Sequence, residues 1–567
     1  MRRALLQCDG ASAPASLRLQ DWDVSERIFH RGSKANLNLN IESPAHALLT
    51  GLEDRAADLV RIAAYVYAAD QMVSRGGDAD VFGDNWERHF TMCIPVTEPE
   101  LWGEKRVLRL LREVLRFATG DSWTFQFSRS VPNERQLPFH IDPAVATSDP
   151  DSVFLFSGGI DSLCAVVEAA FLQGKKPLLV GHSPAYHIQS RQRRLAEILG
   201  DRHGRWKPFP YLSVAIHRMG SDPRDYSQRS RAFLYASLGV AIAHLLGLNE
   251  TMLPDNGVVS LNLPINNQLF GTKASRSTHP KFLFLFNQLA QVVLPKAPIL
   301  LNPLWSRTRA EGLEILKKAH LEPLLEETNS CSHPRALTKM RPHCGICSQC
   351  IDRRFATLAA GLEQYDPGDR YNTEVFLGAL SEGGARTMAL SYARFGAEVL
   401  RTPPEEMFCR FPELVDALSS SYPNQRHVAE ALTGLLQRHA AGVARVMEEQ
   451  VRRAAPLLAL RQLPTTCLVR LYISDEDVQG VVDFRPNADY RQVWLRGQKF
   501  ELTPNQARVV ELLHSHRLRG SSSLSQDYIL VQLDIKSANL SQVFRGSKAW
   551  GKLIVRSGGR GMYRLNF

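Results

Sequence analysis

The stretch from Asp151 to Ser162 constrains the fold of this chain more than any other. Its apolar run ends in Ser-Gly-Gly-Ile-Asp-Ser at residues 157–162, and a good helix former follows over 163–170. That order predicts a strand, a tight turn and a helix. The two glycines let the backbone approach a ligand, and the helix N-terminus after them favours an anion. The stretch therefore predicts a loop that holds pyrophosphate.

The loop has no lysine where a Walker loop requires one. It resembles instead the PP-loop of the ATP pyrophosphatase superfamily, whose signature is Ser-Gly-Gly-x-Asp-Ser and whose members cleave ATP between the α and β phosphates. The resemblance implies an ATP site made of the whole motif: Ser157, Gly158, Gly159, Ile160, Asp161 and Ser162. It also implies catalytic roles for Ser157 and Asp161, with Mg²⁺ near Asp161. A surface turn with a helix cap is the alternative interpretation.

Four cysteines form the second strong signal. Cys331 is followed by Cys344, Cys347 and Cys350, and the last three are separated by two-residue gaps. Four thiolates so placed can hold one tetrahedral Zn²⁺ in a closed, structural site. A chance cluster or a redox pair is the alternative. Arg353 and Arg354 follow at once, and we expect them to face whatever the zinc loop covers.

Strands and helices alternate from residue 150 to about 365, which is typical of a parallel sheet in an α/β fold. His182 ends the second buried strand, and Asn256 lies in a turn after a later strand. The turn that holds Asn256 falls at the edge of the sheet where ligands bind in open α/β folds. Arg231 lies near the start of a long apolar helix over residues 230–246. We predict an α/β PP-loop (HUP-like) domain over residues 150–365 that carries the zinc loop.

Together, the loop and the cysteine pattern resemble the 7-cyano-7-deazaguanine synthase family, QueC, over about residues 150–360. The resemblance implies that ATP activates the carboxylate of 7-carboxy-7-deazaguanine, which is then amidated and dehydrated to a nitrile. It implies a catalytic Arg231 and nucleotide contacts from His182 and Asn256. The chain departs from the family at Ala232, where the family has asparagine, and at Gly181-His182-Ser183, where the family has Tyr-Gly-Gln. The resemblance therefore supports ATP chemistry more strongly than it supports the family's substrate pocket.

Residues 1–149 are predicted to form an α+β domain, with strands at 17–19 and 37–41 among others. Its Ile-Pro-Val and Thr-Gly-Asp-Ser-Trp segments, at 94–96 and 119–123, resemble the QueC-like component of Qat-type anti-phage systems. That resemblance implies antiviral defence and protein partners encoded in the same operon. Related proteins are implied to join a deazaguanine to a protein amine.

Residues 366–465 read as a helical region, with helices at 426–440 and 442–460 among others. Residues 466–567 read as a winged helix-turn-helix, with a third helix from 537 to about 550 and a wing hairpin over 553–565. Residues 491–567 hold thirteen Lys and Arg against four Asp and Glu, in a chain whose net charge is +10. Asn539, Gln542 and Arg545 are the few candidates for reading bases. This surplus of positive charge favours the binding of nucleic acid through phosphate contacts. Docking of a protein is the alternative for such a module.

The chain has no run of eighteen apolar residues, so we expect no membrane span. Its first residues begin like a signal peptide, but Gln7 and Asp9 interrupt the apolar core. The nine cysteines fit a reducing compartment with one metal site better than disulfides. We therefore expect a cytoplasmic protein.

Three functions remain open on these grounds. The leading one is an ATP-dependent ligase or synthase that uses ATP, Mg²⁺ and Zn²⁺ and acts on a deazapurine carboxylate. The second is an adaptor that senses ATP or another nucleotide and recruits DNA or proteins through its winged helix. The third is a tRNA sulfur transferase, which calls for catalytic cysteines. Cys164 lies one turn into the helix after the loop, and we expect it to be a core residue.

Overall fold

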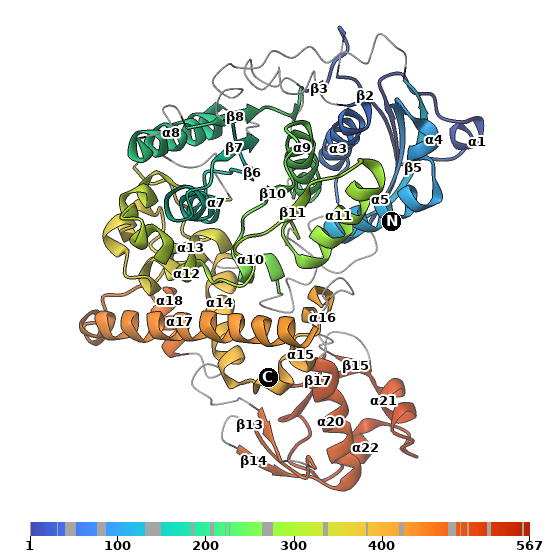
Figure 1. Ribbon diagram of the computed structural model, residues 1–567. Coiled ribbons are helices and arrows are strands. Elements are labelled where there is room, and N and C mark those ends of the chain that lie inside the picture. The colour runs from blue at the N-terminus through green and yellow to red at the C-terminus, as the bar shows by residue number, and fades with distance from the viewer. Residues whose placement is uncertain are drawn as a thin grey trace. The chain divides into compact units, whose positions relative to one another are not determined.

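The structure is a computed structural model (Figure 1). It describes residues 2–30, 32–39, 53–75, 87–130, 149–182, 186–204, 209–220, 223–225, 227–263, 276–332, 338, 340–381, 384–418, 425–474, 484–487, 489–495, 498–518, 523–557 and 561–566. These residues form two compact units. The first comprises Met1–Leu460 with Thr466–Leu468, and the second comprises Arg461–Thr465 with Val469–Phe567.

The loop predicted from the sequence lies in a five-stranded sheet whose strand pairs are all parallel. The strand order is β11-β10-β6-β7-β8, with bounds β6 (Ser152–Leu155), β7 (Pro177–His182), β8 (Tyr211–Val214), β10 (Glu250–Met252) and β11 (Ile299–Leu301). The first of these strands along the chain, β6, is therefore central, and later strands add to both of its sides. The order reverses between β6 and β10, and such a switch point leaves a crevice at the carboxyl ends of the strands. The predicted parallel α/β fold is confirmed.

Helices cover both faces of this sheet. The side chains of β6 alternate between two cores: Val153 and Leu155 pack with α9 (Arg231–Leu245), and Phe154 with α7 (Ile160–Val167) and α12 (Arg309–Lys318). The backbone of α9 comes close to the sheet at Gly239, where a Cβ would lie 2.6 Å from Cγ2 of Thr251. The helices α8 (Tyr186–His203) and α13 (Ser348–Ala359) complete the surroundings of the loop (Figure 1).

The N-terminal sheet differs from its prediction. Its order is β2-β1-β4-β5 and every pair is parallel, with β1 (Arg2–Cys8), β2 (Val24–Ile28), β4 (Arg88–Val96) and β5 (Ser122–Arg129). The predicted α+β class is therefore wrong for this part, because α3 (Asp54–Met72) and α5 (Lys105–Thr119) are crossovers between parallel strands.

The two strands predicted in the N-terminal part have different outcomes. The strand predicted at 17–19 falls largely on a short helix, α1 (Ala15–Arg18), which buries none of its residues. Three residues of alternating pattern are too few to specify a strand, and proline before a helix favours helix entry. The strand predicted at 37–41 is β3 (Leu37–Asn38), and residues 40–41 lie outside the described part.

A continuous apolar core joins the two parallel sheets. It runs from Phe90 and Trp123 of the N-terminal sheet, through the almost wholly buried α3, to α9 and Val153 of the five-stranded sheet. Residues 1–149 and 150–365 thus share one core inside the first compact unit. The domain boundary at residue 149 stays a prediction.

The region after residue 365 is helical, as expected, with α14 (Gly384–Arg401) packed on α17 (Gln425–Ala459). Two helices were predicted at 426–440 and 442–460, but α17 is one helix of 35 residues. Gly442 alone costs a helix only about 1 kcal/mol, which the packing of Val443 and Val446 offsets.

The second compact unit has its own core. It contains the antiparallel strands β12 (Phe484–Pro486), β13 (Gln492–Leu495) and β14 (Gln498–Glu501), then α20 (Pro504–Leu518), β15 (Leu524–Ser525), α21 (Gln526–Gln532) and α22 (Leu540–Val543), and the hairpin of β16 (Ile554–Arg556) and β17 (Met562–Leu565). This order is compatible with the winged helix-turn-helix, which stays a prediction.

Two details of that unit differ from expectation. The third helix, predicted from 537 to about 550, contains only the four residues of α22. The Asn539 side chain caps α22 by accepting from the Gln542 amide at 3.0 Å, so it is engaged locally. Residues 558–560 of the predicted wing lie outside the described part. Within the described residues, no helix is both long and apolar enough to cross a bilayer.

Candidate functional site

The predicted loop has the strand–turn–helix form that its sequence indicates. The amide of Phe156 donates to the Val180 carbonyl at 2.8 Å, which extends the sheet pairing to the edge of the loop. Gly158 then takes a φ of 76°, a conformation that favours glycine, and α7 begins at Ile160. Beside the turn, the Gln192 side chain leaves little space, since a Cβ on Gly158 would lie 3.3 Å from Gln192 Cγ.

The two hydroxyl groups of the loop hydrogen-bond to each other and to the loop backbone. Ser157 Oγ lies 3.2 Å from Ser162 Oγ and accepts from the Gly159 amide at 3.3 Å. Ser162 Oγ donates to the Gly159 carbonyl at 3.1 Å. Ser157 is exposed and Gly159 half-buried, whereas Ser162 is buried. A ligand can therefore reach Ser157 and Gly159 at the start of α7, while Ser162 shapes the loop from below.

Asp161 points into a buried chain of charges. Arg309 donates to it from Nη2 at 2.8 Å and from Nε at 3.3 Å, and Asn256 Nδ2 donates at 3.2 Å. Nη1 of the same Arg309 lies 2.6 Å from Oδ2 of Asp352, whose other oxygen accepts from Tyr392 at 2.5 Å. Burial alone would raise the pKa of Asp161, but the Arg309 guanidinium keeps that pKa below its usual value. Asp161 is therefore an ionised, fully engaged carboxylate.

Asp255 is a second carboxylate beside Asp161. It follows β10, is half-buried, and accepts from Thr278 Oγ1 at 3.2 Å. Asn302, after β11, fixes its backbone through bonds of 3.2 and 2.8 Å to the Asp255 amide and carbonyl. Burial, and then the charge of Asp161, raise the pKa of Asp255 well above its usual value. The two carboxylates therefore share a proton at the switch point.

The donor chemistry of this pair fits Mg²⁺, which binds one or two carboxylates together with phosphate oxygens. The fit differs from the expectation that centred the ion on Asp161, because Arg309 and Asn256 already occupy that side chain. Asp255 is the carboxylate that a divalent cation could bind in place of a proton. Sequence reasoning missed Asp255, Arg309 and Asp352. Only the position of Asp255 after a strand could have signalled one of them.

His182 and Arg231 form a different group. The His182 ring lies at the end of β7 with only 3% of the residue exposed, and its Nε2 is 2.6 Å from the Ile216 carbonyl. It packs edge-on against Tyr67 and Tyr235, and burial lowers its pKa to about 4. Arg231 is exposed at the start of α9, with its guanidinium 5.8 Å from the Tyr235 ring centre. In the described part of the chain, no hydrogen bond joins this group to Asp161 or Arg309, so the nucleotide contact of His182 stays a prediction.

The four cysteines come together as predicted. The Sγ atoms of Cys331, Cys344, Cys347 and Cys350 all lie within 4.8 Å of one another. The Cys344–Cys350 pair is 3.8 Å apart, and tetrahedral Zn–S bonds of about 2.3 Å place two sulfurs about 3.8 Å apart. Gly345 has a φ of 81°, and a Cβ there would lie 1.7 Å from the Thr373 carbonyl oxygen. These residues fit a closed metal site such as one for zinc.

Asn329 ties the cysteine loop to the 157–162 loop. Its amide donates to the Gly158 carbonyl at 3.2 Å, its Oδ1 accepts from the Cys331 amide at 2.7 Å, and its Nδ2 donates to the Pro342 carbonyl at 3.2 Å. A metal at the cysteines would therefore stabilise the segment that packs against the 157–162 loop.

The expectation for Arg353 and Arg354 is wrong. Arg353 is wholly buried and donates to Asp366 at 3.0 Å and to Thr328 Oγ1 at 2.7 Å. Arg354 donates to the Asp366 carbonyl at 2.6 Å and to Glu363 at 2.9 Å. Both side chains brace the segment after α13, and both carboxylate partners lie further along the chain, where spacing alone could not reveal them.

Cys164 is a buried core residue, as expected, and burial raises the pKa of its thiol. The arrangement as a whole offers exposed loop groups for an anion and, next to them, a carboxylate pair for a cation. Comparisons with protein-family models, with curated proteins and with solved structures return no match to this chain.

Proposed function

We propose that this protein is an ATP-dependent enzyme that activates a carboxylate and releases pyrophosphate. The observation that carries the proposal is the meeting of the 157–162 loop with the Asp161–Asp255 pair at one switch point. A loop for phosphates beside a site for their counter-cation is what nucleotide cleavage needs, because such catalysis depends on positioning and charge stabilisation.

Each residue has a task in this proposal. The amides at the start of α7 and the Ser157 hydroxyl bind the phosphates of ATP. Arg309 and Asn256 hold Asp161 in place, and burial, followed by the charge of Asp161, raises the pKa of Asp255. Asp255 would hold Mg²⁺, which when bound neutralises charge on the departing pyrophosphate.

The reaction is an in-line displacement at the α phosphorus. A carboxylate oxygen of the substrate forms a bond to that phosphorus, and the bond to the β-phosphate oxygen breaks, so that pyrophosphate leaves with its electron pair. An amine then attacks the acyl carbon and displaces AMP. Arg231, exposed near the same edge, is suited to bind the substrate carboxylate.

The resemblance to QueC suggests a deazapurine carboxylate, probed first with 7-carboxy-7-deazaguanine. The acceptor amine would be ammonia or a protein, and the resemblance to Qat-type components places the reaction in anti-phage defence with partner proteins. Zinc at the four cysteines would keep the Asn329 segment folded against the loop.

The adaptor is the second candidate, and one observation favours it. The second compact unit exposes a series of cations that includes Lys536, Arg545, Lys548, Lys552 and Arg556. Such a surface suits contacts with nucleic-acid phosphates or with an acidic protein. In that case the loop would bind nucleotide without turnover.

The test follows ATP, AMP and pyrophosphate when the full chain meets 7-carboxy-7-deazaguanine, Mg²⁺ and ammonia, with mass spectrometry of small products and of co-expressed proteins. AMP formation that Ser157→Ala lowers strongly would support the enzyme. Ser237→Ala is the control, because its buried Oγ has no hydrogen-bond partner among the residues that the structure describes, so AMP formation should be unchanged. ATP that binds but stays intact with every substrate and partner would favour the adaptor.

A further inference from the structure

The outer face of α5 is a cationic stripe. Five of its residues are exposed cations, Lys105, Arg106, Arg109, Arg112 and Arg116, and Glu113 is the only acidic residue of the helix. Lys105, Arg109, Arg112 and Arg116 fall within about 60° of arc around the helix axis and span about 16 Å along it. The opposite face, with Val107, Leu111 and Val114 among others, is buried in the core.

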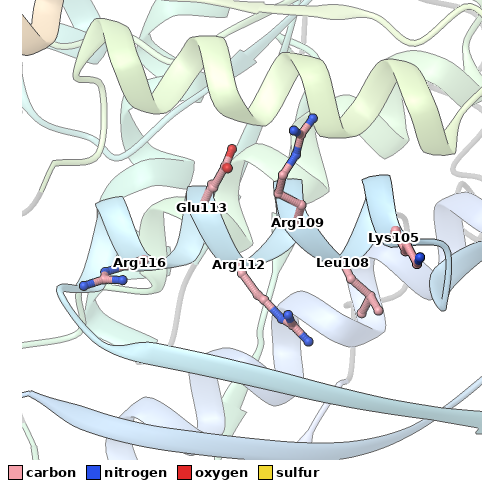
Figure 2. A pocket seen from close by; sticks show the side chains of 6 residues that line it. All are labelled: Lys105, Leu108, Arg109, Arg112, Glu113 and Arg116. Carbon is pink, nitrogen blue, oxygen red and sulfur yellow. The ribbon is translucent and has the colours of Figure 1, made fainter.

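The stripe is hollowed along its length. Figure 2 shows Arg109 and Glu113 pointing to one side of the helix, and Leu108 and Arg112 pointing to the other. The furrow between them has a volume of about 380 Å³ and is lined by these four residues with Lys105 and Arg116. None of these residues belongs to the phosphate-binding loop or to the cysteine cluster.

No described residue neutralises the stripe. Its five cations form no salt bridge with any other residue that the structure describes. The neighbouring helix α11 (Pro280–Val293) has no acidic residue, and its Lys281 pairs with Asp416 at 2.7 Å. Lys281 and Arg276 both lie over the Phe117 ring near the C-terminal end of α5, at 5.2 and 4.8 Å from its centre. Like charges one turn apart repel, so α5 keeps this face at a cost in stability.

We propose that the α5 stripe binds the phosphate backbone of double-stranded nucleic acid. The stripe rises about 16 Å from Lys105 to Arg116, and this length measured along a duplex axis corresponds to about five phosphates of one strand at 3.4 Å each. Arginine forks match phosphate oxygens well. The stripe has one partly buried leucine and no aromatic side chain, so it offers neither the apolar anchor that a docking peptide needs nor a platform for stacked bases.

The binding is insensitive to sequence, because backbone contacts carry no base information. It is independent of ATP turnover and of the winged helix, whose cations lie in the other compact unit. It brings the enzyme, or the adaptor, onto nucleic acid through its first 460 residues.

The test compares two triple variants of the full chain, Arg109→Gln/Arg112→Gln/Arg116→Gln and Arg426→Gln/Arg452→Gln/Arg453→Gln. The second set is the matched control: its three exposed arginines lie on α17, pair with Glu430 or Glu449 and, for Arg453, also with Glu363, and lose the same charge. Both are made in a Lys548→Gln/Lys552→Gln/Arg556→Gln background, so that the second unit does not mask the effect. The probes are mixed-sequence duplexes of DNA and of RNA, titrated over a range of salt.

We expect the α5 variant to bind duplex about tenfold more weakly, with a salt dependence of log K shallower by about 2.7 for three lost phosphate contacts. The control should bind as its parent does, and the thermal midpoint of the α5 variant should not fall, because repulsion is relieved. The DNA and RNA arms then show which duplex the stripe prefers.

Two outcomes would overturn the proposal. Equal loss in both variants would assign the effect to net charge. Unchanged duplex binding, with poly-glutamate binding lost only in the α5 variant, would assign the stripe to an acidic protein. Either result leaves the AMP-forming activity as a separate question, since α5 contributes no residue to that site.

Discussion

Nη2 of Arg309 lies 2.8 Å from Oδ2 of Asp161, while Nη1 of the same side chain lies 2.6 Å from Oδ2 of Asp352. One guanidinium thus joins the first turn of α7 to the second turn of α13, the helix that the cysteines begin. All three side chains are buried, so none of the charges can turn to water instead. The relative position of the two loops depends on this contact.

Arg309→Met should destabilise the protein by about 3–5 kcal/mol, because it leaves Asp161 and Asp352 buried without a cation. Chemical denaturation at neutral pH measures the loss. Arg307→Met is the control, since Arg307 is partly exposed and pairs with Glu168 at 2.8 Å. A loss of less than 1 kcal/mol for Arg309→Met would show that water reaches the two carboxylates.

Asp255→Asn should abolish AMP formation and yet stabilise the protein at neutral pH. The raised pKa means that folded Asp255 keeps a proton which the unfolded chain releases above about pH 4. Wild-type stability therefore falls by up to about 1.4 kcal/mol per pH unit between the unfolded and folded pKa values, and the variant lacks this slope.

Chemical denaturation of wild type and Asp255→Asn from pH 4 to pH 8 tests whether the stability of wild type alone falls as the pH rises. Asp416→Asn is the control, because that carboxylate is exposed and pairs with Lys281. Stability curves of wild type and Asp255→Asn that run parallel would contradict a shared proton at Asp161 and Asp255.

Zinc content should be about one ion per chain and should depend on the cluster alone. Cys347→Ser should lose the metal, and removal by a chelator should expose the 331–350 segment to protease and weaken nucleotide binding through Asn329. Elemental analysis and limited proteolysis are the measurements. Cys409→Ser is the control, since Cys409 is exposed and outside the cluster. Equal zinc loss in both variants would refute the assignment.

Gly345→Ala should disrupt the cysteine loop, because its Cβ would meet the Thr373 carbonyl oxygen at 1.7 Å. Gly361→Ala is a sharp control: its φ is 69°, close to the 81° of Gly345, but nothing lies within 4 Å of the new Cβ. Both variants lose about 1–2 kcal/mol of stability because alanine disfavours the left-handed backbone conformation. Only Gly345→Ala loses further stability through the clash.

Zinc content and the midpoint of thermal unfolding separate the two effects. Gly345→Ala should lose both metal and stability, whereas Gly361→Ala should lose only stability. If the two variants match in both measurements, backbone conformation alone explains the glycine at 345.

The sequence by itself determined the features whose causes are local. Ser157–Ser162 after an apolar run dictates a strand, a turn and a helix start, and the spacing of Cys344, Cys347 and Cys350 brings their sulfurs together within one short loop. The alternation of strands and helices also indicated the parallel five-stranded sheet, because parallel strands need crossover helices. These predictions needed only neighbours in the chain.

Only the tertiary structure decided the partners of the buried charges. Asp161, Asp255 and Arg309 are separated by dozens of residues, and no spacing rule shows that folding buries Asp161 and Arg309 and places Asp255 beside them. The same holds for Arg353. Its position after the cysteines predicted that it faces whatever the zinc loop covers, but in the folded chain it donates to Asp366. A buried charge must find a counter-charge wherever the fold supplies one, and in this chain strand order, not sequence distance, determines where that is.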